Sequence, residues 1–223
     1  MSKCIVIAAG GHAREIAAYL LDDPDTRDRF AGAFDDACSM PVSWHGSHLL
    51  GNSNDLPAFC AAHPAVCYII AVGSNAVRKK IALRIEAMGI PNLTPFTVRH
   101  SSAWTGHAVS VGEGTLLAPN SIITTTAKIG RHVILNVKAS ISHDCEIGDF
   151  CNINPNATLC GDVHLGEGCY VGAGATIIEK RKIGAWTIIG AGAVVTHDLP
   201  EGVTAVGVPA RIIKHSPYPA RSR

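Results

Sequence analysis

An aliphatic residue recurs at every sixth position through the second half of the chain. Ile, Leu or Val fills each position of the series Val111, Leu117, Ile123, Ile129, Leu135, Ile141, Ile147, Ile153, Leu159, Leu165, Val171, Ile177, Ile183, Ile189 and Val195. If about a quarter of residues were Ile, Leu or Val by chance, such a run would have odds on the order of one in a billion. The period fits neither an α-helix, at 3.6 residues, nor a strand, at 2.0. It therefore indicates a structural repeat.

The position four places after the aliphatic is also restricted. Its occupants are small or β-branched: Thr115, Ser121, Ala127, Val133, Ala139, Cys145, Cys151, Ala157, Val163, Cys169, Ala175, Thr187 and Ala193, with Arg181 as the misfit. A six-residue repeat is typical of a parallel β-helix, in which three short strands and three corners make one coil. Residues 18 apart should then stack about 4.8 Å apart. We expect the aliphatic to point inward, and the glycine that often follows it, as at Gly112 and Gly130, to adopt backbone angles that other residues avoid.

Composition agrees with such a coil and excludes several classes of function. Of 223 residues, 22 are Gly, 5% are aromatic and 17% are charged, with a net charge of +1. This charge gives no electrostatic basis for binding nucleic acid or an anionic membrane. No apolar run approaches the ~20 residues of a membrane span, and no signal peptide is expected. The eight cysteines form no CxxC pair, and several fall in the repeat, so we expect reduced thiols and a cytoplasmic protein.

The first ninety-odd residues follow a different pattern. A buried strand over residues 4–9 precedes a helix near His12, a second strand ends at Phe34, and a third spans residues 68–72. A second helix follows with Val77, Ile81, Ile85 and Met88 on one face, and residues 90–93 form a last strand. This order predicts a small parallel-sheet α/β domain, Rossmann-like, over residues 1–97. The β-helix with its cap would occupy 98–214, and 215–223 would be a disordered tail.

A Gly-Gly turn lies between the first strand and the first helix. Backbone N–H groups at a helix N-terminus suit a phosphate. The segment Gly10-Gly11-His12 lacks the G-x-G-x-x-G spacing, which argues against an NAD-dependent dehydrogenase. A plain tight turn remains the alternative interpretation.

Four segments together, residues 7–14, 34–36, 71–78 and 100–103, resemble the PglD/NeuD-type nucleotide-sugar acetyltransferases. These belong to the left-handed β-helix hexapeptide-repeat acyltransferase superfamily, and the similarity extends over residues 3–213. The resemblance implies a left-handed coil and an N-terminal domain that binds the nucleotide-linked sugar. If the family's substrate-binding positions apply to this chain, they are Gly10, Gly11, His12, Asp35, Asp36, Gly73, Ser74 and Asn75.

His143 and Asp144 stand out at one corner of the predicted coil. A neutral imidazole can act as a general base, and a carboxylate beside it can fix its tautomer. A solvent-facing polar pair is the alternative interpretation. Gly161 lies 18 residues after His143 and should sit over it in the next coil. The backbone N–H of Gly161 would then be free to approach a thioester oxygen. The resemblance implies that His143 is the base, with Asp144 beside it in place of the more common Glu.

The resemblance also implies acetyl-CoA as co-substrate, held in a groove between β-helices of a homotrimer. The flanking positions would be Asn152, Gly161, Ala173, Ala191, Pro209 and Arg211, with Asn152 replacing a second His that related enzymes often carry. No metal is expected. Zinc-dependent β-helix enzymes need two histidines five residues apart, and His132, His143 and His164 are 11 and 21 apart.

These observations predict an acetyl-CoA-dependent N-acetyltransferase acting on the amino group of a nucleotide-linked sugar. The sugar would be a 4-amino-4,6-dideoxyhexose, GDP- or UDP-linked, destined for a surface glycan. Transfer would be direct, with His143 as general base and no acyl-enzyme. The alternatives are a sugar O-acetyltransferase of the sialic-acid type and a non-enzymatic β-helix scaffold.

Overall fold

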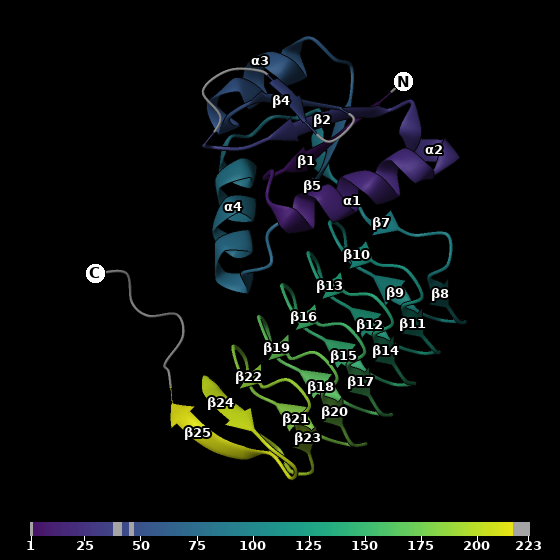
Figure 1. The fold of residues 1–223 in the computed structure, drawn as a ribbon, viewed down its shortest axis with the longest axis vertical. Helices are drawn as coiled ribbons and strands as arrows, with labels where there is room; N and C mark the ends of the chain where they lie inside the picture. The colour runs from purple at the N-terminus through teal and green to yellow at the C-terminus, as the bar shows by residue number, and fades with distance from the viewer. Residues whose placement is uncertain (1, 38–41, 45–46, 216–223) are drawn as a thin grey trace. The chain divides into compact units, whose positions relative to one another are not determined.

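The computed structural model describes residues 2–37, 42–44 and 47–215. By its internal contacts the chain divides into two units, residues 1–98 and 99–223 (Figure 1). No helix in the described residues is long and apolar enough to cross a membrane.

The first unit is a six-stranded sheet with the order β3-β4-β2-β1-β5-β6. The strands are β1 (Lys3–Ile7), β2 (Phe30–Phe34), β3 (Val42–Trp44), β4 (Ser47–Gly51), β5 (Val66–Ile70) and β6 (Leu93–Pro95). The helices are α1 (Gly11–Asp22), α2 (Pro24–Arg27), α3 (Leu56–Ala61) and α4 (Asn75–Ala87), with a 3-10 turn η1 (Ser53–Asp55). All neighbouring strands are parallel except β3 and β4, which form an antiparallel hairpin.

The expected α/β domain is confirmed, with differences at its edges. Helix α1 buries the expected face, from Ala13 to Leu20. The last strand begins at Leu93, later than expected, and the hairpin, α2 and α3 were not predicted because they are short. The face expected for α4 is wrong in part: Ile85 is buried but Val77 is 45% exposed. The helix instead turns Arg78 inward, where Nη1 donates to the carbonyl of Val72 at 2.8 Å.

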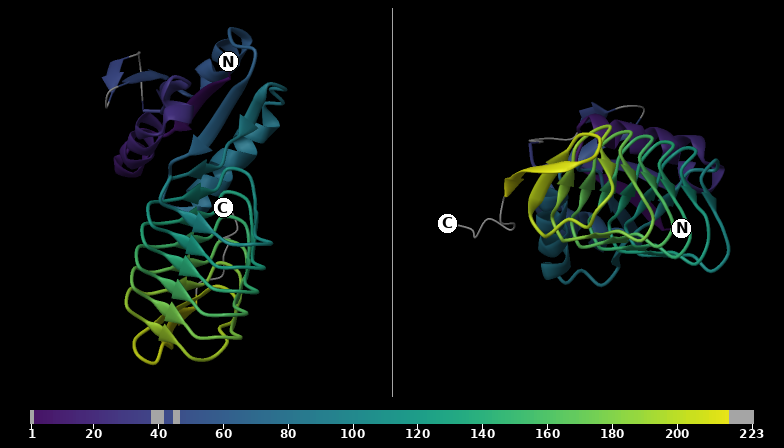
Figure 2. Two further views of the ribbon diagram at one scale, coloured as in Figure 1. Left: turned by 90° about the vertical axis from the view of Figure 1, so that its right-hand side faces the viewer. Right: turned by 90° about the horizontal axis from the view of Figure 1, so that it is seen from below.

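The second unit is a left-handed parallel β-helix built from three sheets (Figure 2). One sheet contains β7 (Val98–Arg99), β10 (Leu116–Leu117), β13 (Ile134–Leu135), β16 (Asn152–Ile153), β19 (Tyr170–Val171), β22 (Ile188–Ile189), β24 (Val203–Val206) and β25 (Arg211–His215). A second contains β8 (Trp104–Thr105), β11 (Ile122–Ile123), β14 (Ser140–Ile141), β17 (Thr158–Leu159), β20 (Thr176–Ile177) and β23 (Val194–Val195). The third contains β9 (Ser110–Val111), β12 (Lys128–Ile129), β15 (Glu146–Ile147), β18 (His164–Leu165) and β21 (Lys182–Ile183).

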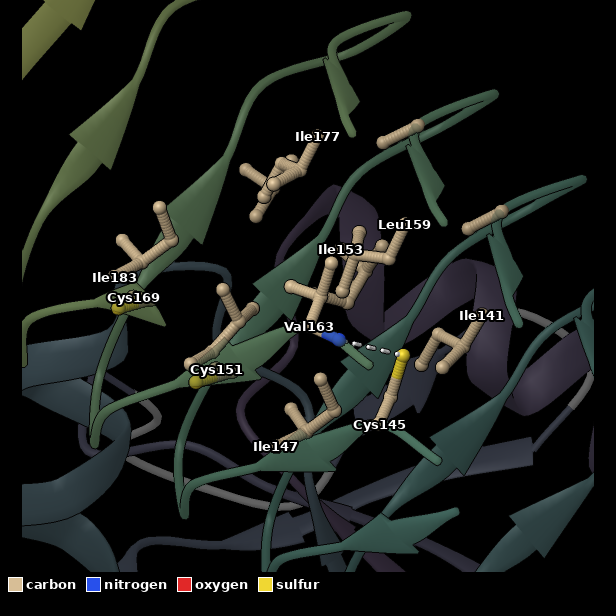
Figure 3. Packing of buried hydrophobic residues seen from close by; sticks show 14 of the residues in the cluster. Ile141, Cys145, Ile147, Cys151, Ile153, Leu159, Val163, Cys169, Ile177 and Ile183 are labelled. Atoms are coloured by element: carbon tan, nitrogen blue, oxygen red, sulfur yellow. Dashed lines mark hydrogen bonds between the residues drawn. The ribbon is translucent and has the colours of Figure 1, made fainter. Parts of the chain in front are cut away.

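The predicted 18-residue stacking is the observed register, since Ile123 pairs with Ile141 and Leu159 with Ile177. Figure 3 shows the aliphatic and small side chains together in the interior. Cysteine suits the small position for a second reason. The thiols of Cys145, Cys151 and Cys169 each lie 3.1–3.2 Å from a backbone carbonyl of the coil wall, as hydrogen-bond donors.

The role expected for the repeated glycines is wrong. Gly112 and Gly130 do not have positive φ, whereas the residue three places after the aliphatic does, as in Asn120 at 57° and Asp144 at 60°. The glycines are needed for space, because a Cβ on Gly112 would lie 2.5 Å from the backbone of Gly130 in the next coil. Stacked backbones leave no room for a side chain there.

Arg181 is accommodated by a shorter final coil. Leu199 bridges to Ile183, a spacing of 16 residues instead of 18, and Arg181 turns outward. Its Nε donates to the carbonyl of Glu179 at 3.1 Å, and its guanidinium lies 3.6 Å from the carboxylate of Asp198. Strands β24 and β25 then form the antiparallel cap. His215 closes β25, and the rest of the tail expected from that point lies outside the described residues.

Candidate functional site

His143 and Asp144 lie at the corner between β14 and β15, and both side chains are exposed. Asp144 holds the left-handed position of the turn, with φ at 60°. Its Oδ2 lies 2.8 Å from Nδ1 of His143. The corner geometry therefore presents an imidazole–carboxylate pair to solvent.

The hydroxyl of Thr126, one coil earlier, donates to Oδ1 of Asp144 at 2.6 Å. This hydrogen bond, followed by the one from His143, lowers the pKa of Asp144 below its usual range. An ionised carboxylate can only accept hydrogen bonds, so Nδ1 of His143 must be the donor and a neutral ring keeps its lone pair on Nε2. Sequence reasoning missed Thr126, although the 18-residue spacing to Asp144 was available to find it.

Gly161 lies against the ring of His143, as its position 18 residues on predicted. A Cβ at Gly161 would be 2.5 Å from both Cε1 and Nε2 of the imidazole. The Gly161 N–H has no hydrogen-bond partner within the described part of the chain. The glycine therefore leaves room for the ring and keeps a backbone donor beside it.

Of the positions expected to flank acetyl-CoA, Gly161 lies beside His143, but the other corner and cap positions lie elsewhere. Ala173 and Ala191 are exposed at the corners that follow β19 and β22, and Pro209 and Arg211 are exposed in the cap. His143 and Gly161 instead occupy the corners that follow β14 and β17. One chain thus carries the two sets of residues on different corners.

Asn152 belongs to neither corner. It begins β16, in register with Tyr170 of β19. Its side chain is only 2% exposed, although the outward position Tyr170 beside it is 37% exposed. Within one chain, Asn152 lies on a strand of one sheet and His143 at a corner between the other two sheets.

In the first unit, three loops that carry predicted residues meet at one edge of the sheet. Ile7 pairs with Ile70 and with Phe34, so the loops after β1, β5 and β2 are adjacent. These loops hold Gly10 and Gly11, Gly73 with Ser74, and Asp35 with Asp36. The structure therefore brings these sequence-predicted residues together at the carboxyl ends of parallel strands, where α/β sheets bind ligands.

The glycines at this edge have open surroundings. A Cβ on Gly10 or Gly73 would meet nothing within 4 Å, and Gly10 precedes α1 without positive φ. His12, in the first turn of α1, pairs through Nδ1 with Glu15 at 3.1 Å. Its Nε2 is buried with no hydrogen-bond partner among the described residues. An open helix N-terminus with a spare imidazole nitrogen suits an anionic ligand.

Ser74 caps α4, and its hydroxyl accepts a hydrogen bond from the N–H of Val77 at 3.5 Å. Asn75 begins the helix and is 8% exposed. Ser74 is exposed at the N-terminus of α4, whereas Asn75 is buried there.

A cavity of about 210 Å³ opens at the ends of β1 and β2. It is lined by Ile7, Ala8, Phe34, Asp35, Asp36, Ser53, Val72, Ile81 and Arg84. The hydrogen bond from the Ser53 hydroxyl, ahead of the contact with Arg84, lowers the pKa of Asp36 below its ordinary value. Ser53 and Arg84 escaped sequence reasoning because they are distant in sequence from Asp36 and carry no motif.

Within the described residues, no group of three or more His, Cys, Asp or Glu side chains could hold a metal ion. Each unit thus carries a candidate site of its own: a polar corner on the β-helix, and a cavity with an open loop edge in the first unit.

Comparison with known proteins adds two family models. The PglD N-terminal domain model matches residues 3–85, and the bacterial transferase hexapeptide model matches residues 144–179 and 162–197. The curated UDP-N-acetylbacillosamine N-acetyltransferase of Bacillus subtilis (strain 168) is 37% identical over 120 residues, which are 52% of this chain. That match spans about half, 51%, of the curated protein's length.

Two solved structures match almost the whole chain. A mutant of perosamine N-acetyltransferase from Caulobacter crescentus, in complex with CoA and GDP-perosamine, is 30% identical with a TM-score of 0.88. The match covers 96% of this chain and 98% of that one. The acetyltransferase domain of PglB from Neisseria gonorrhoeae FA1090, in complex with acetyl coenzyme A, is 28% identical with a TM-score of 0.81, covering 95% of this chain and 98% of the other.

Proposed function

We propose, since the chain belongs to the PglD/NeuD-type nucleotide-sugar acetyltransferases of the hexapeptide-repeat superfamily, that it acetylates the amino group of a nucleotide-linked 4-amino-4,6-dideoxy sugar with acetyl-CoA as donor. The observation that carries this proposal is the corner of the β-helix at which Thr126, Asp144 and His143 form one hydrogen-bonded chain.

The proposed reaction is a direct transfer. The sugar nitrogen attacks the thioester carbonyl carbon, and Nε2 of His143 takes the proton that the nitrogen loses. The Gly161 N–H stabilises the oxyanion of the tetrahedral intermediate. The C–S bond then breaks, and the CoA thiolate leaves and takes up a proton. Asp144 stays ionised and stabilises the imidazolium, so the corner needs no acyl-enzyme.

The first unit would hold the nucleotide. The open N-terminus of α1 at Gly10 and Gly11 suits the diphosphate, with Nε2 of His12 as an additional donor when protonated. The cavity beside Asp35 and Asp36 is of a size for a nucleobase. Gly73 leaves space at the same edge of the sheet. These features support a nucleotide-linked substrate over a free sugar.

We further propose a homotrimer with acetyl-CoA between neighbouring β-helices. One chain carries the base and Gly161 at one side of the coil and Ala173, Ala191, Pro209 and Arg211 at other places, so a second copy is needed to bring the two groups together. Exposed apolar side chains on one sheet, Trp104 and Ile122, support burial against another copy. Light scattering that gave a monomeric mass would contradict this part of the proposal.

The test is CoA-thiol release from acetyl-CoA with UDP-, GDP- and dTDP-linked 4-amino sugars and, in a parallel arm, a sialic acid. We expect release with a nucleotide-linked amino sugar, and a loss of about 100-fold or more in kcat for His143→Ala. Mass spectrometry should place the acetyl group on nitrogen. The proposal would be overturned if only the sialic acid gave CoA release, or if none of the acceptors in the panel did.

A further inference from the structure

One wall of the cavity in the first unit places a guanidinium directly beside carboxylates. Nη1 of Arg84, on α4, lies 2.8 Å from Oδ2 of Asp36, which follows β2. Asp35 lines the same cavity. Both members of the Arg84–Asp36 pair are about half exposed, at 45% and 53% of their side chains. The wall therefore presents donors and acceptors next to each other where a ligand can reach them.

The carboxylates are held in place but retain capacity. Oδ1 of Asp36 accepts from both the hydroxyl and the N–H of Ser53, at 2.5 and 3.1 Å. The two oxygens of Asp35 accept from the N–H groups of Ala9 and Ala37, at 2.7 and 2.9 Å. A carboxylate oxygen has two acceptor sites. Each oxygen of Asp35 therefore has one acceptor site left for a ligand, and so has Oδ2 of Asp36.

Arg84 keeps most of its donors. A guanidinium has five N–H groups in a rigid fork. Its contact with Asp36 is its only ion pair or hydrogen bond within the described residues. The edge formed by Nε and Nη2 is therefore available for a two-point contact with a pair of adjacent acceptors.

The order of groups along this wall matches one base better than the others. Guanine carries two adjacent acceptors, N7 and O6, followed by the donors N1–H and N2–H₂. The Arg84 edge fits the acceptor pair, and the neighbouring carboxylates fit the donors. Uracil and thymine alternate acceptor, donor, acceptor, so they offer the guanidinium fork no pair of adjacent acceptors. Adenine places its amino donor beside N7, against the guanidinium. Cytosine matches in part, with two acceptors and one amino donor.

We propose that Arg84, set beside Asp36 and Asp35, makes this cavity selective for guanine, so that the substrate is a GDP-linked amino sugar. This inference rests on the proposed function, and it goes beyond it by naming the base and the residue that recognises it. Arg84 acts here as a binding residue for the nucleotide, remote from the acetyl transfer.

The test is a calorimetric titration of the full-length protein with GDP, CDP, UDP, dTDP and ADP. We expect GDP to bind at least about tenfold more tightly than UDP or dTDP, in keeping with the discrimination typical of a two-point arginine–guanine contact. Arg84→Met should remove this preference, and Arg84→Lys should not restore it, because an ammonium lacks the fork. Lys80→Met is the matched control, since it removes one charge from an exposed position of the same helix.

The possible outcomes distinguish the inference about the nucleobase from the proposal about acetyl transfer. Tighter binding of UDP, dTDP or CDP than of GDP would overturn the guanine inference, even if a UDP-linked sugar is acetylated. An unchanged preference in a folded Arg84→Met variant would overturn the role of Arg84. A GDP preference without CoA release from any GDP-linked amino sugar would support the cavity and count against the proposed function instead. No binding of any nucleoside diphosphate would overturn both.

Discussion

Asp144 accepts a hydrogen bond of 2.6 Å from the hydroxyl of Thr126, which stands one coil, 18 residues, earlier in the β-helix. Because Asp144 also contacts Nδ1 of His143, the hydroxyl acts on the imidazole through the carboxylate. Thr126 therefore helps to position the imidazole that we propose as the general base. This arrangement depends on the 18-residue register of the coil.

Replacing Thr126 by Val should lower kcat about tenfold with little change in the KM for either substrate, because the base is oriented less well but the binding positions are intact. Thr126→Ser keeps the hydroxyl and should retain most of the activity. The measurement is steady-state kinetics across pH, since loss of the hydrogen bond also raises the pKa of Asp144 toward its ordinary value. Equal activity of the Val and Ser variants would contradict this role.

Gly161→Ala should displace the imidazole of His143, because the added Cβ would lie 2.5 Å from the ring. We expect kcat to fall by about 100-fold with little loss of stability, because the exposed imidazole can move aside. Gly174→Ala is the control: that glycine has φ at 66° and open surroundings, so it should cost stability but not activity. If the folded Gly161→Ala variant kept full activity, the close approach of Gly161 to the His143 ring would not be needed for catalysis.

The acetyl-CoA positions can be tested by charge. Ala191→Asp should raise the KM for acetyl-CoA about tenfold, because an anion beside the phosphate-bearing co-substrate is repelled. Ala185→Asp is matched, since Ala185 stands two places after the aliphatic of β21 as Ala191 does after that of β22. The KM for the nucleotide sugar should not change in either variant. Equal effects of the two substitutions on acetyl-CoA would argue against the corner at Ala191.

Ser53→Ala tests the lowered pKa of Asp36. A carboxyl whose folded pKa lies below its ordinary value of 3.8 contributes stability above that value, and the contribution is lost as pH falls through the folded pKa. Removing the Ser53 hydroxyl removes the main cause of the shift. The Tm difference between the wild type and Ser53→Ala should therefore be constant from pH 7 to about 5 and narrow below pH 4. A Tm difference between the two proteins that widened in acid would contradict the lowered pKa of Asp36.

Much of the β-helix could be predicted because its rule is local and repeated. Each hexad places one aliphatic inward, as with Ile141 and Ile153, both fully buried. The position of Gly161 over His143 followed from the same period. The reason for the repeated glycines did not, because a close approach such as that of Gly112 to Gly130 involves backbone of the next coil, which a sequence pattern does not describe.

The role of His143 as general base came from the family resemblance and stays a prediction. The sequence by itself determined the period, the inward side chains and the parallel α/β unit before the coil. Those features depend on neighbours in the chain or on a fixed spacing of 18 residues. The tertiary structure decided which polar groups meet across larger separations. Asp36, after β2, meets Ser53 of η1 and Arg84 of α4 because the folded sheet brings these two elements to the carboxyl end of β2. His143 lies on a different corner from Ala173 and Ala191 because the three-sided coil turns the chain between them.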